Sequence, residues 1–138
     1  NKNIYRKKNV KRFIFPKLRF EISNSISRFA SSCIDVSDGF IADLEKILIP
    51  SYQGAVINLD KIPRVDKSSL EDFTFGDDLE LIFTADKKYH KKIMKLSDNS
   101  GINITLIGQT KKNSEIKYIL NNDEVLFPRK KGWNHGKK

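Results

Sequence analysis

The stretch SCIDVSDGFIADLEKILIP, residues 32–50, contains an apolar run, a polar junction and a helical repeat in succession. Residues 32–36 are short and flanked by apolar side chains, which predicts a buried strand. Ser-Asp-Gly follows at residues 37–39, and apolar residues then recur at three- and four-residue spacing, which predicts a helix over residues 38–49. Pro50 ends that helix, because proline lacks the backbone donor that a helix interior needs.

Strand and helix patterns alternate along the rest of the chain. Further elements are predicted as follows: helices over residues 22–32 and 87–97, strands over 55–59, 79–84 and 102–109, and a hairpin of residues 115–120 and 123–127 around Asn121-Asn122. This order predicts an α+β domain with one mixed β-sheet and helices packed on it. The domain is expected over residues 13–138, after a basic flexible arm or interdomain linker over residues 1–12.

The composition limits the class of protein. Of the 138 residues, 38% are hydrophobic and 31% are charged, which suits one modest core and a well-solvated surface. No run of about 18 apolar residues occurs, so no membrane-spanning helix is predicted. The single cysteine, Cys33, cannot form an internal disulfide, and a buried structural thiol in a reducing cytosol is expected. The net charge of +9 favours anionic partners, small or polymeric.

Asp35, Ser37 and Asp38 lie at the junction of the predicted strand and helix. Mg²⁺ prefers one or two carboxylates, with water and phosphate oxygens as its other ligands, and a helix N-terminus attracts phosphate. The junction can therefore hold a metal-bound nucleotide. In the alternative, structural interpretation, Ser37 or Asp38 caps the helix. Asp35 fits that interpretation poorly, because an unpaired carboxylate in an apolar strand is costly.

Two further segments carry acidic or aromatic side chains that can meet a ligand. Residues 76–84 read GDDLELIFT, and Asp77 and Asp78 can bind a ligand or share a cation. The alternative there is a turn before a half-buried strand, with Glu80 facing solvent. Trp133 can stack on a flat heterocycle or serve only as a packing anchor. The sequence contains no phosphate-binding P-loop and no histidine and cysteine cluster with zinc spacing.

Three segments, in order along the chain, resemble motifs of the thiamine-monophosphate kinases. IDVSDGF at residues 34–40 is similar to I-D-[IV]-S-D-G-L, GDDLELIFT at 76–84 to G-E-D-Y-E-L-x-F-T, and GWNH at 132–135 to the terminal G-[YW]-D-H-F. The resemblance covers about residues 12–136. It implies an α+β fold like the C-terminal domain of aminoimidazole ribonucleotide synthetase, in a superfamily that also includes selenophosphate synthetase.

The resemblance implies a cytoplasmic, ATP-dependent kinase that converts thiamine phosphate to thiamine diphosphate. Asp35 and Asp38 would bind Mg²⁺, Ser37 would contact ATP, and Asp77 and Trp133 would contact thiamine phosphate. No catalytic residue beyond the metal ligands is implied, because in-line phosphoryl transfer needs positioning and charge neutralisation more than a strong base. The family's N-terminal domain, which forms the homodimer and supplies further metal-binding aspartates, is expected to be absent, so the chain alone would lack much of the active site.

The segments depart from the family motifs at four positions. Asp77 stands in place of Glu, Leu79 in place of Tyr, Asn134 in place of Asp and Gly136 in place of Phe. These changes leave the metal pair intact and affect the expected thiamine contacts. Two alternatives stay open: a degenerate pseudoenzyme on the same fold, and a nucleic-acid or other polyanion-binding module that uses the +9 charge and the aromatic residues of the basic arm. Nucleic acid is the less expected partner, because an interdomain linker also explains the arm.

Overall fold

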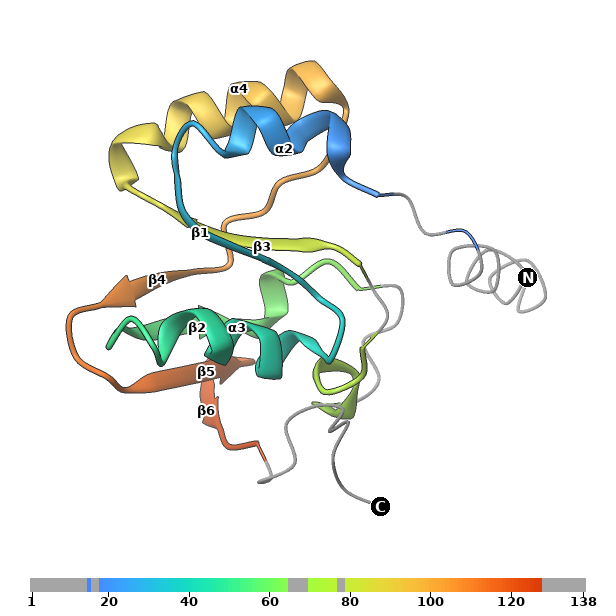
Figure 1. Ribbon diagram of the computed structural model, residues 1–138. Helices are drawn as coiled ribbons and strands as arrows, with labels where there is room; N and C mark the ends of the chain where they lie inside the picture. Colours follow the sequence, from blue (N-terminus) through green and yellow to red (C-terminus); the bar gives the residue numbers. More distant parts are fainter. Residues whose placement is uncertain (1–14, 16–17, 65–69, 77–78, 128–138) are drawn as a thin grey trace.

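The computed structural model describes residues 15, 18–64, 70–76 and 79–127, and their strands form two separate sheets (Figure 1). In the first sheet, β1 (Ala30–Asp35) pairs antiparallel with β3 (Leu81–Ala85). The second has the order β4-β2-β5-β6 and contains β2 (Gly54–Asn58), β4 (Gly108–Lys111), β5 (Ile116–Leu120) and β6 (Asp123–Val125). This sheet is mixed, because β2 pairs parallel with β5, whereas the β2–β4 and β5–β6 pairs are antiparallel. The α+β class is confirmed, but the described strands are divided between two sheets instead of the single one predicted.

The helices lie in two places relative to these sheets (Figure 1). α2 (Phe20–Ile26) and α4 (His90–Ser100) contact each other beside the β1–β3 pair, whereas α3 (Phe40–Leu48) packs on the four-stranded sheet. Three short 3-10 helices complete the described elements: η1 (Leu59–Lys61), η2 (Leu70–Phe73) and η3 (Lys87–Tyr89). None of the helices in the described part of the chain is long and apolar enough to cross a membrane.

The core forms where α3 meets the strands. The apolar stripe of α3 is buried from Phe40 to Leu48, and it packs on Ile57 of β2, Ile82 of β3 and Tyr118 of β5. Each such apolar side chain stabilises the fold by roughly 1.5–3 kcal/mol on burial. The predicted helix over residues 38–49 is thus confirmed to within two residues at its start and one at its end.

β1 differs from the buried strand that was predicted. Its side chains alternate between half-buried and exposed positions, and Cys33 and Asp35 both fall on the exposed side. The expectation of a buried Cys33 is therefore wrong, and no cost of burying Asp35 arises. The physical reason is that a two-stranded sheet with helices beside one face leaves its other face to solvent. The helix predicted over residues 22–32 is likewise shorter, because α2 ends at Ile26 and β1 begins at Ala30.

Of the two predictions for the C-terminal strands, one is wrong and one is confirmed. Only the last two residues of the strand predicted over residues 102–109 form a strand, since β4 covers Gly108–Lys111. The Ser97 hydroxyl donates to the Ile102 carbonyl at 2.8 Å and accepts from the Ile104 N–H at 3.1 Å, which ties this segment to the end of α4. The hairpin of β5 and β6 is confirmed, and its two turn asparagines adopt the positive φ angles of 52° and 69° that a two-residue hairpin turn requires. The predicted arm over residues 1–12 lies outside the described residues.

Candidate functional site

The loop that joins β1 to α3 lies beside the loop that precedes β3. The Val36 N–H donates to the Glu80 carbonyl at 2.8 Å, and the Val36 carbonyl accepts from the Leu79 N–H at 2.9 Å. These bonds continue the β1–β3 pairing, in which Asp35 is opposite Leu81. Two segments that the sequence places about 40 residues apart thus become neighbours, and they are the first two segments singled out from the sequence.

Two glycines allow the loops to pack backbone against backbone. Gly39 has φ +124°, and a Cβ on it would lie 2.6 Å from the Thr74 carbonyl oxygen. A Cβ on Gly76 would overlap the Ser37 carbonyl oxygen. Any larger residue at position 76 would push the loop of Ser37 away from β3. The glycines therefore fix the spacing between the loop that carries Asp38 and the segment that continues into Asp77, although Asp77 itself lies outside the described residues.

Asp43, in the first turns of α3, holds the loop after β1 in place. Its side chain is 0% exposed, and Oδ2 accepts from the backbone N–H groups of Ser37 at 2.9 Å, Asp38 at 2.9 Å and Gly39 at 3.2 Å. The other oxygen, Oδ1, accepts from Lys46 Nζ at 2.7 Å. Such charge-assisted bonds are among the stronger hydrogen bonds in proteins. The loop backbone is thus fixed by a carboxylate from inside the helix.

This arrangement replaces the helix cap that the structural interpretation had predicted. The N-cap residue of α3 is Gly39, so neither Ser37 nor Asp38 occupies the cap position. Sequence reasoning missed Asp43. A signal for it exists, because Asp43 falls three residues after Phe40 and next to Leu44, on the stripe that is otherwise apolar. A carboxylate at such a position needs buried partners.

The three residues predicted from the junction lie close together in the chain but differ in their surroundings. Asp35 ends β1 with an exposed side chain, and Ser37 is exposed in the loop. Asp38 is 19% exposed, and its Oδ2 lies 2.5 Å from Lys46 Nζ. The hydrogen bonds that Lys46 donates to Asp38 and, second, to Asp43 raise the pKa of Lys46, so its ammonium keeps its charge in neutral solution.

The donor set fits a cation that takes few protein ligands. No group of three or more His, Cys, Asp or Glu side chains gathers in the described ranges, so a fully protein-enclosed metal site is not what these residues build. Asp35 and Asp38 provide two partly accessible carboxylates, and Mg²⁺ is commonly bound by one or two carboxylates together with phosphate oxygens and water. The residues therefore fit the Mg²⁺ that the resemblance implies.

Glu80 does not point freely into solvent, contrary to the structural interpretation of its segment. Arg19 binds it through two parallel bonds, from Nε to Oε2 at 2.8 Å and from a terminal nitrogen to Oε1 at 2.6 Å. The hydrogen bond to Glu80 raises the pKa of Arg19. This bidentate pair connects the residue before α2 with the residue before β3.

Comparison with known proteins supplies a relationship that covers almost the whole chain. No protein-family model matches it. The thiamine-monophosphate kinase of Buchnera aphidicola subsp. Acyrthosiphon pisum is 34% identical over 136 residues, which cover 91% of this chain and 42% of that protein. The enzyme of Leptospira interrogans is 31% identical over 126 residues, covering 86% and 39%. The chain is a relative of the thiamine-monophosphate kinases. It corresponds to their C-terminal part and spans about two fifths of their length.

Solved structures agree with this relationship to the thiamine-monophosphate kinases. The enzyme from Stenotrophomonas maltophilia K279a superimposes with a TM-score of 0.71 at 25% identity, over 83% of this chain and 39% of that one. The structure of AaThiL complexed with AMPPCP and TMP gives a TM-score of 0.72 at 23% identity, over 95% and 42%. The fold expected from the resemblance, that of the aminoimidazole ribonucleotide synthetase superfamily, is thus confirmed.

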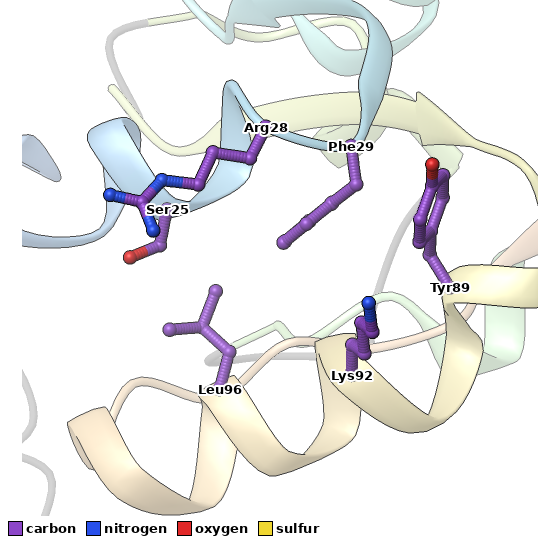
Figure 2. Close-up of a pocket in the computed structure, with 6 residues that line it drawn as sticks. All are labelled: Ser25, Arg28, Phe29, Tyr89, Lys92 and Leu96. Atoms are coloured by element: carbon purple, nitrogen blue, oxygen red, sulfur yellow. The ribbon is translucent and has the colours of Figure 1, made fainter.

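A pocket of about 280 Å³ lies between α2 and α4, away from the loops of residues 35–39 and 74–76 (Figure 2). It is lined by Ser25, Arg28, Phe29, Tyr89, Lys92 and Leu96. None of the residues predicted for metal, ATP or thiamine phosphate is among them. Phe29 and Tyr89 lie with their ring centroids 6.0 Å apart, and Lys92 lies 5.8 Å over the Tyr89 ring. The rings and the stem of Lys92 pack where the two helices meet, which identifies the pocket as a gap in helix packing.

Trp133, which was predicted to contact thiamine phosphate, lies outside the described residues.

Proposed function

We propose that this domain forms part of the site at which a kinase transfers the γ-phosphoryl group of ATP to thiamine phosphate, yielding thiamine diphosphate. The observation that carries the proposal is the backbone packing of the Asp35–Gly39 loop against the Thr74–Gly76 loop. This packing brings the predicted metal ligands beside the segment that leads into Asp77. Relatives named thiamine-monophosphate kinase and a structural neighbour complexed with AMPPCP and TMP support the choice of substrates.

Each predicted residue has a role that suits its position. Asp35 and Asp38 would hold Mg²⁺, and Ser37 would contact ATP from the exposed side of the same loop. A bound Mg²⁺ would neutralise the charge that phosphate oxygens carry during transfer. Asp77 and Trp133 would contact thiamine phosphate. Asp43 keeps the loop backbone rigid, so that the reacting groups are positioned without rearrangement.

We further propose that another part of the enzyme completes the site. The chain covers 42% of the Buchnera kinase, and two partly exposed carboxylates are too few to hold a metal-bound triphosphate alone. We propose that an N-terminal half supplies further aspartates and forms a homodimer, and that the enzyme works in the cytoplasm. The isolated chain is then expected to make little or no thiamine diphosphate.

The test measures thiamine diphosphate formed from thiamine phosphate and Mg-ATP. The chain is assayed alone and together with the N-terminal domain of a related kinase, using the original sequence, Asp35→Asn, Asp38→Asn and the matched control Asp98→Asn on α4. Product is expected only in the mixture, and it should fall by at least about tenfold in the two loop variants but not in the control. Product from the chain alone that is lost in Asp35→Asn would contradict the need for a second half. Product that is insensitive to both loop variants would contradict the proposed site.

A second candidate function is binding to a polyanion. Five exposed lysines on η3 and α4 favour it: Lys87, Lys88, Lys91, Lys92 and Lys95. An amphipathic helix explains the same lysines, since α4 also carries the half-buried Ile93 and Leu96 and its lysines are solvated. The dependence of affinity on salt and on Asp38 separates the two candidates.

A further inference from the structure

Lys46 places one ammonium group between two carboxylates of the candidate site. Its Nζ lies 2.5 Å from Asp38 Oδ2 and 2.7 Å from Asp43 Oδ1. Asp43 is fully buried and Asp38 is 19% exposed, whereas Lys46 is 48% exposed. The cation therefore lies at the solvent side of the pair, where it can leave one partner without crossing the core.

The two carboxylates hold Lys46 for different reasons. Asp43 is taken out of water, and besides three backbone N–H groups it has Lys46 as a charged partner. Removing that partner would leave a buried carboxylate with its charge poorly compensated. Asp38 is accessible and can exchange one cation for another. A lysine side chain has a flexible four-carbon stem, so its ammonium can move from Asp38 while it stays near Asp43 on the same helix.

The Asp38 oxygen that Lys46 binds is also an oxygen offered to the divalent cation. A metal ion at Asp38 Oδ2 would lie within a few ångströms of the ammonium, where like charges repel strongly because solvent screening is incomplete. The two cations therefore compete for Asp38. In the absence of metal, Lys46 reduces the repulsion between Asp38 and Asp43, because its ammonium contacts both carboxylates.

We infer that Lys46 is the resident counter-cation of Asp38, and that it moves off Asp38 when a divalent cation binds while it remains paired with Asp43. This inference rests on the proposed function, because it takes Asp38 as a metal ligand. Lys46 thereby sets how tightly the loop binds metal. It does not bind the metal itself.

The first experiment compares metal affinities of the whole chain. Mn²⁺ and Mg²⁺ are titrated into the original chain, Lys46→Met, and Lys95→Met on α4, which removes the same charge in another part of the fold. Lys46→Met is expected to bind metal about two- to fivefold more tightly, the range that an exposed ion pair implies, and Lys95→Met is expected to match the original chain within about 1.5-fold. Equal affinities in the two lysine variants would overturn the inference.

The second experiment uses the unaltered chain, so that it does not depend on the folding of Lys46→Met. Acetylation of individual lysines is followed by mass spectrometry, with and without saturating Mg²⁺. Labelling of Lys46 is expected to rise at least about twofold with metal, and that of Lys95 to stay constant. In Asp38→Asn, Lys46 should be labelled faster from the start and should not respond to metal.

The outcomes separate this inference from the proposed function. If Asp38→Asn weakens metal binding but Lys46 labelling does not respond to metal in the original chain, the inference fails and the proposed metal site stands. If metal binding is unchanged by Asp38→Asn, or is absent even when the N-terminal domain of a related kinase is added, the metal site and the inference fail together. A constant Lys46 signal cannot be attributed to misfolding, because the chain that is labelled carries no substitution.

Discussion

At the scale of single residues, Asp43 supports the loop of the candidate site from inside α3. Three backbone N–H groups and one ammonium depend on its buried carboxylate. Asp43→Asn replaces one acceptor oxygen with an NH₂ group, which is a donor and would face the N–H groups or the ammonium that now donate to Asp43. The variant is expected to lose about 2–4 kcal/mol of unfolding free energy, as for other broken buried charge networks.

Urea unfolding followed by circular dichroism at pH 7 measures this loss. Asp98→Asn, at an exposed position of α4, is the matched control and is expected to change stability by less than about 0.5 kcal/mol. A loss below 1 kcal/mol in Asp43→Asn would show that the loop keeps its backbone without the carboxylate.

Tyr118 provides a pH-dependent prediction. Its hydroxyl donates to Glu45 Oε1 at 3.1 Å, and burial, followed by the charge of Glu45, raises the pKa of Tyr118 well above its usual value near 10. Below pH 10 the phenol is neutral in both the folded and unfolded states. Above pH 10 the unfolded chain releases this proton and the folded chain keeps it, so the folded state loses stability as the pH rises.

Tyr118→Phe removes both the hydrogen bond and this titration. At pH 7 the variant is expected to be about 1 kcal/mol less stable than the original chain, and the difference should shrink between pH 10 and pH 11. Paired urea unfolding curves at these pH values measure it, with Tyr52→Phe, at an 83% exposed position, as the control for tyrosine loss. A difference that grows with pH would contradict the assigned direction of the pKa shift.

Residue types and spacing indicated Asp35, Ser37 and Asp38 as candidates, because carboxylates at a strand-to-helix junction are unusual enough to notice. The same reasoning could not place Lys46 on Asp38, since that contact depends on the direction of two side chains across the start of α3. It also missed the buried Asp43, although the position of this carboxylate on the apolar stripe of α3 was a signal in the sequence. Candidate residues can thus be named from the sequence, whereas the side chains that support their loop depend on the folded structure.

At the scale of elements, two loops meet through Gly39 and Gly76, and a glycine elsewhere serves as a comparison. At Gly76 a Cβ would overlap the Ser37 carbonyl oxygen, whereas at Gly101, after α4, nothing lies within 4 Å but φ is +65°. Gly76→Ala is therefore expected to lose about 2–3 kcal/mol through steric overlap, and Gly101→Ala about 1 kcal/mol through backbone strain alone.

The same pair of variants separates stability from function. Because the overlap at Gly76 displaces the loop that carries Asp38, Gly76→Ala should also weaken Mg²⁺ binding, measured by calorimetry, while Gly101→Ala should not. Equal effects of the two substitutions on both stability and metal binding would contradict close packing of the two loops.

Local patterns predicted the elements whose contacts are local. α3 was evident from its apolar stripe and Pro50, and the β5–β6 hairpin from its two turn asparagines. The β1–β3 pairing joins residues that are 46 positions apart at Asp35 and Leu81, so no local pattern could reveal it or the exposed face that it creates. The strand predicted from residue 102 failed because Ser97 binds that segment.

At the scale of the whole molecule, positive charge is distributed unevenly. The chain carries a net charge of +9, and five of its lysines are exposed on η3 and α4. The loop with Asp35 and Asp38 belongs to a different element and is held by its own lysine. A polyanion would therefore be attracted to α4, and a metal-bound nucleotide to the loop, so the two candidate functions call for different surfaces.

Binding of an oligothymidylate to the chain tests the first of these surfaces. If all five lysines neutralise phosphates, log K falls with log salt with a slope of about −3.5, so affinity drops about a hundredfold between 50 and 200 mM salt. Fluorescence anisotropy is expected to show such weak, salt-sensitive binding, unchanged in Asp38→Asn. The combined Lys88→Gln, Lys92→Gln and Lys95→Gln variant should reduce the slope by about two. Binding that stays tight at 200 mM salt would favour the polyanion module over the kinase, because attraction by a merely solvated lysine face does not survive screening at that ionic strength.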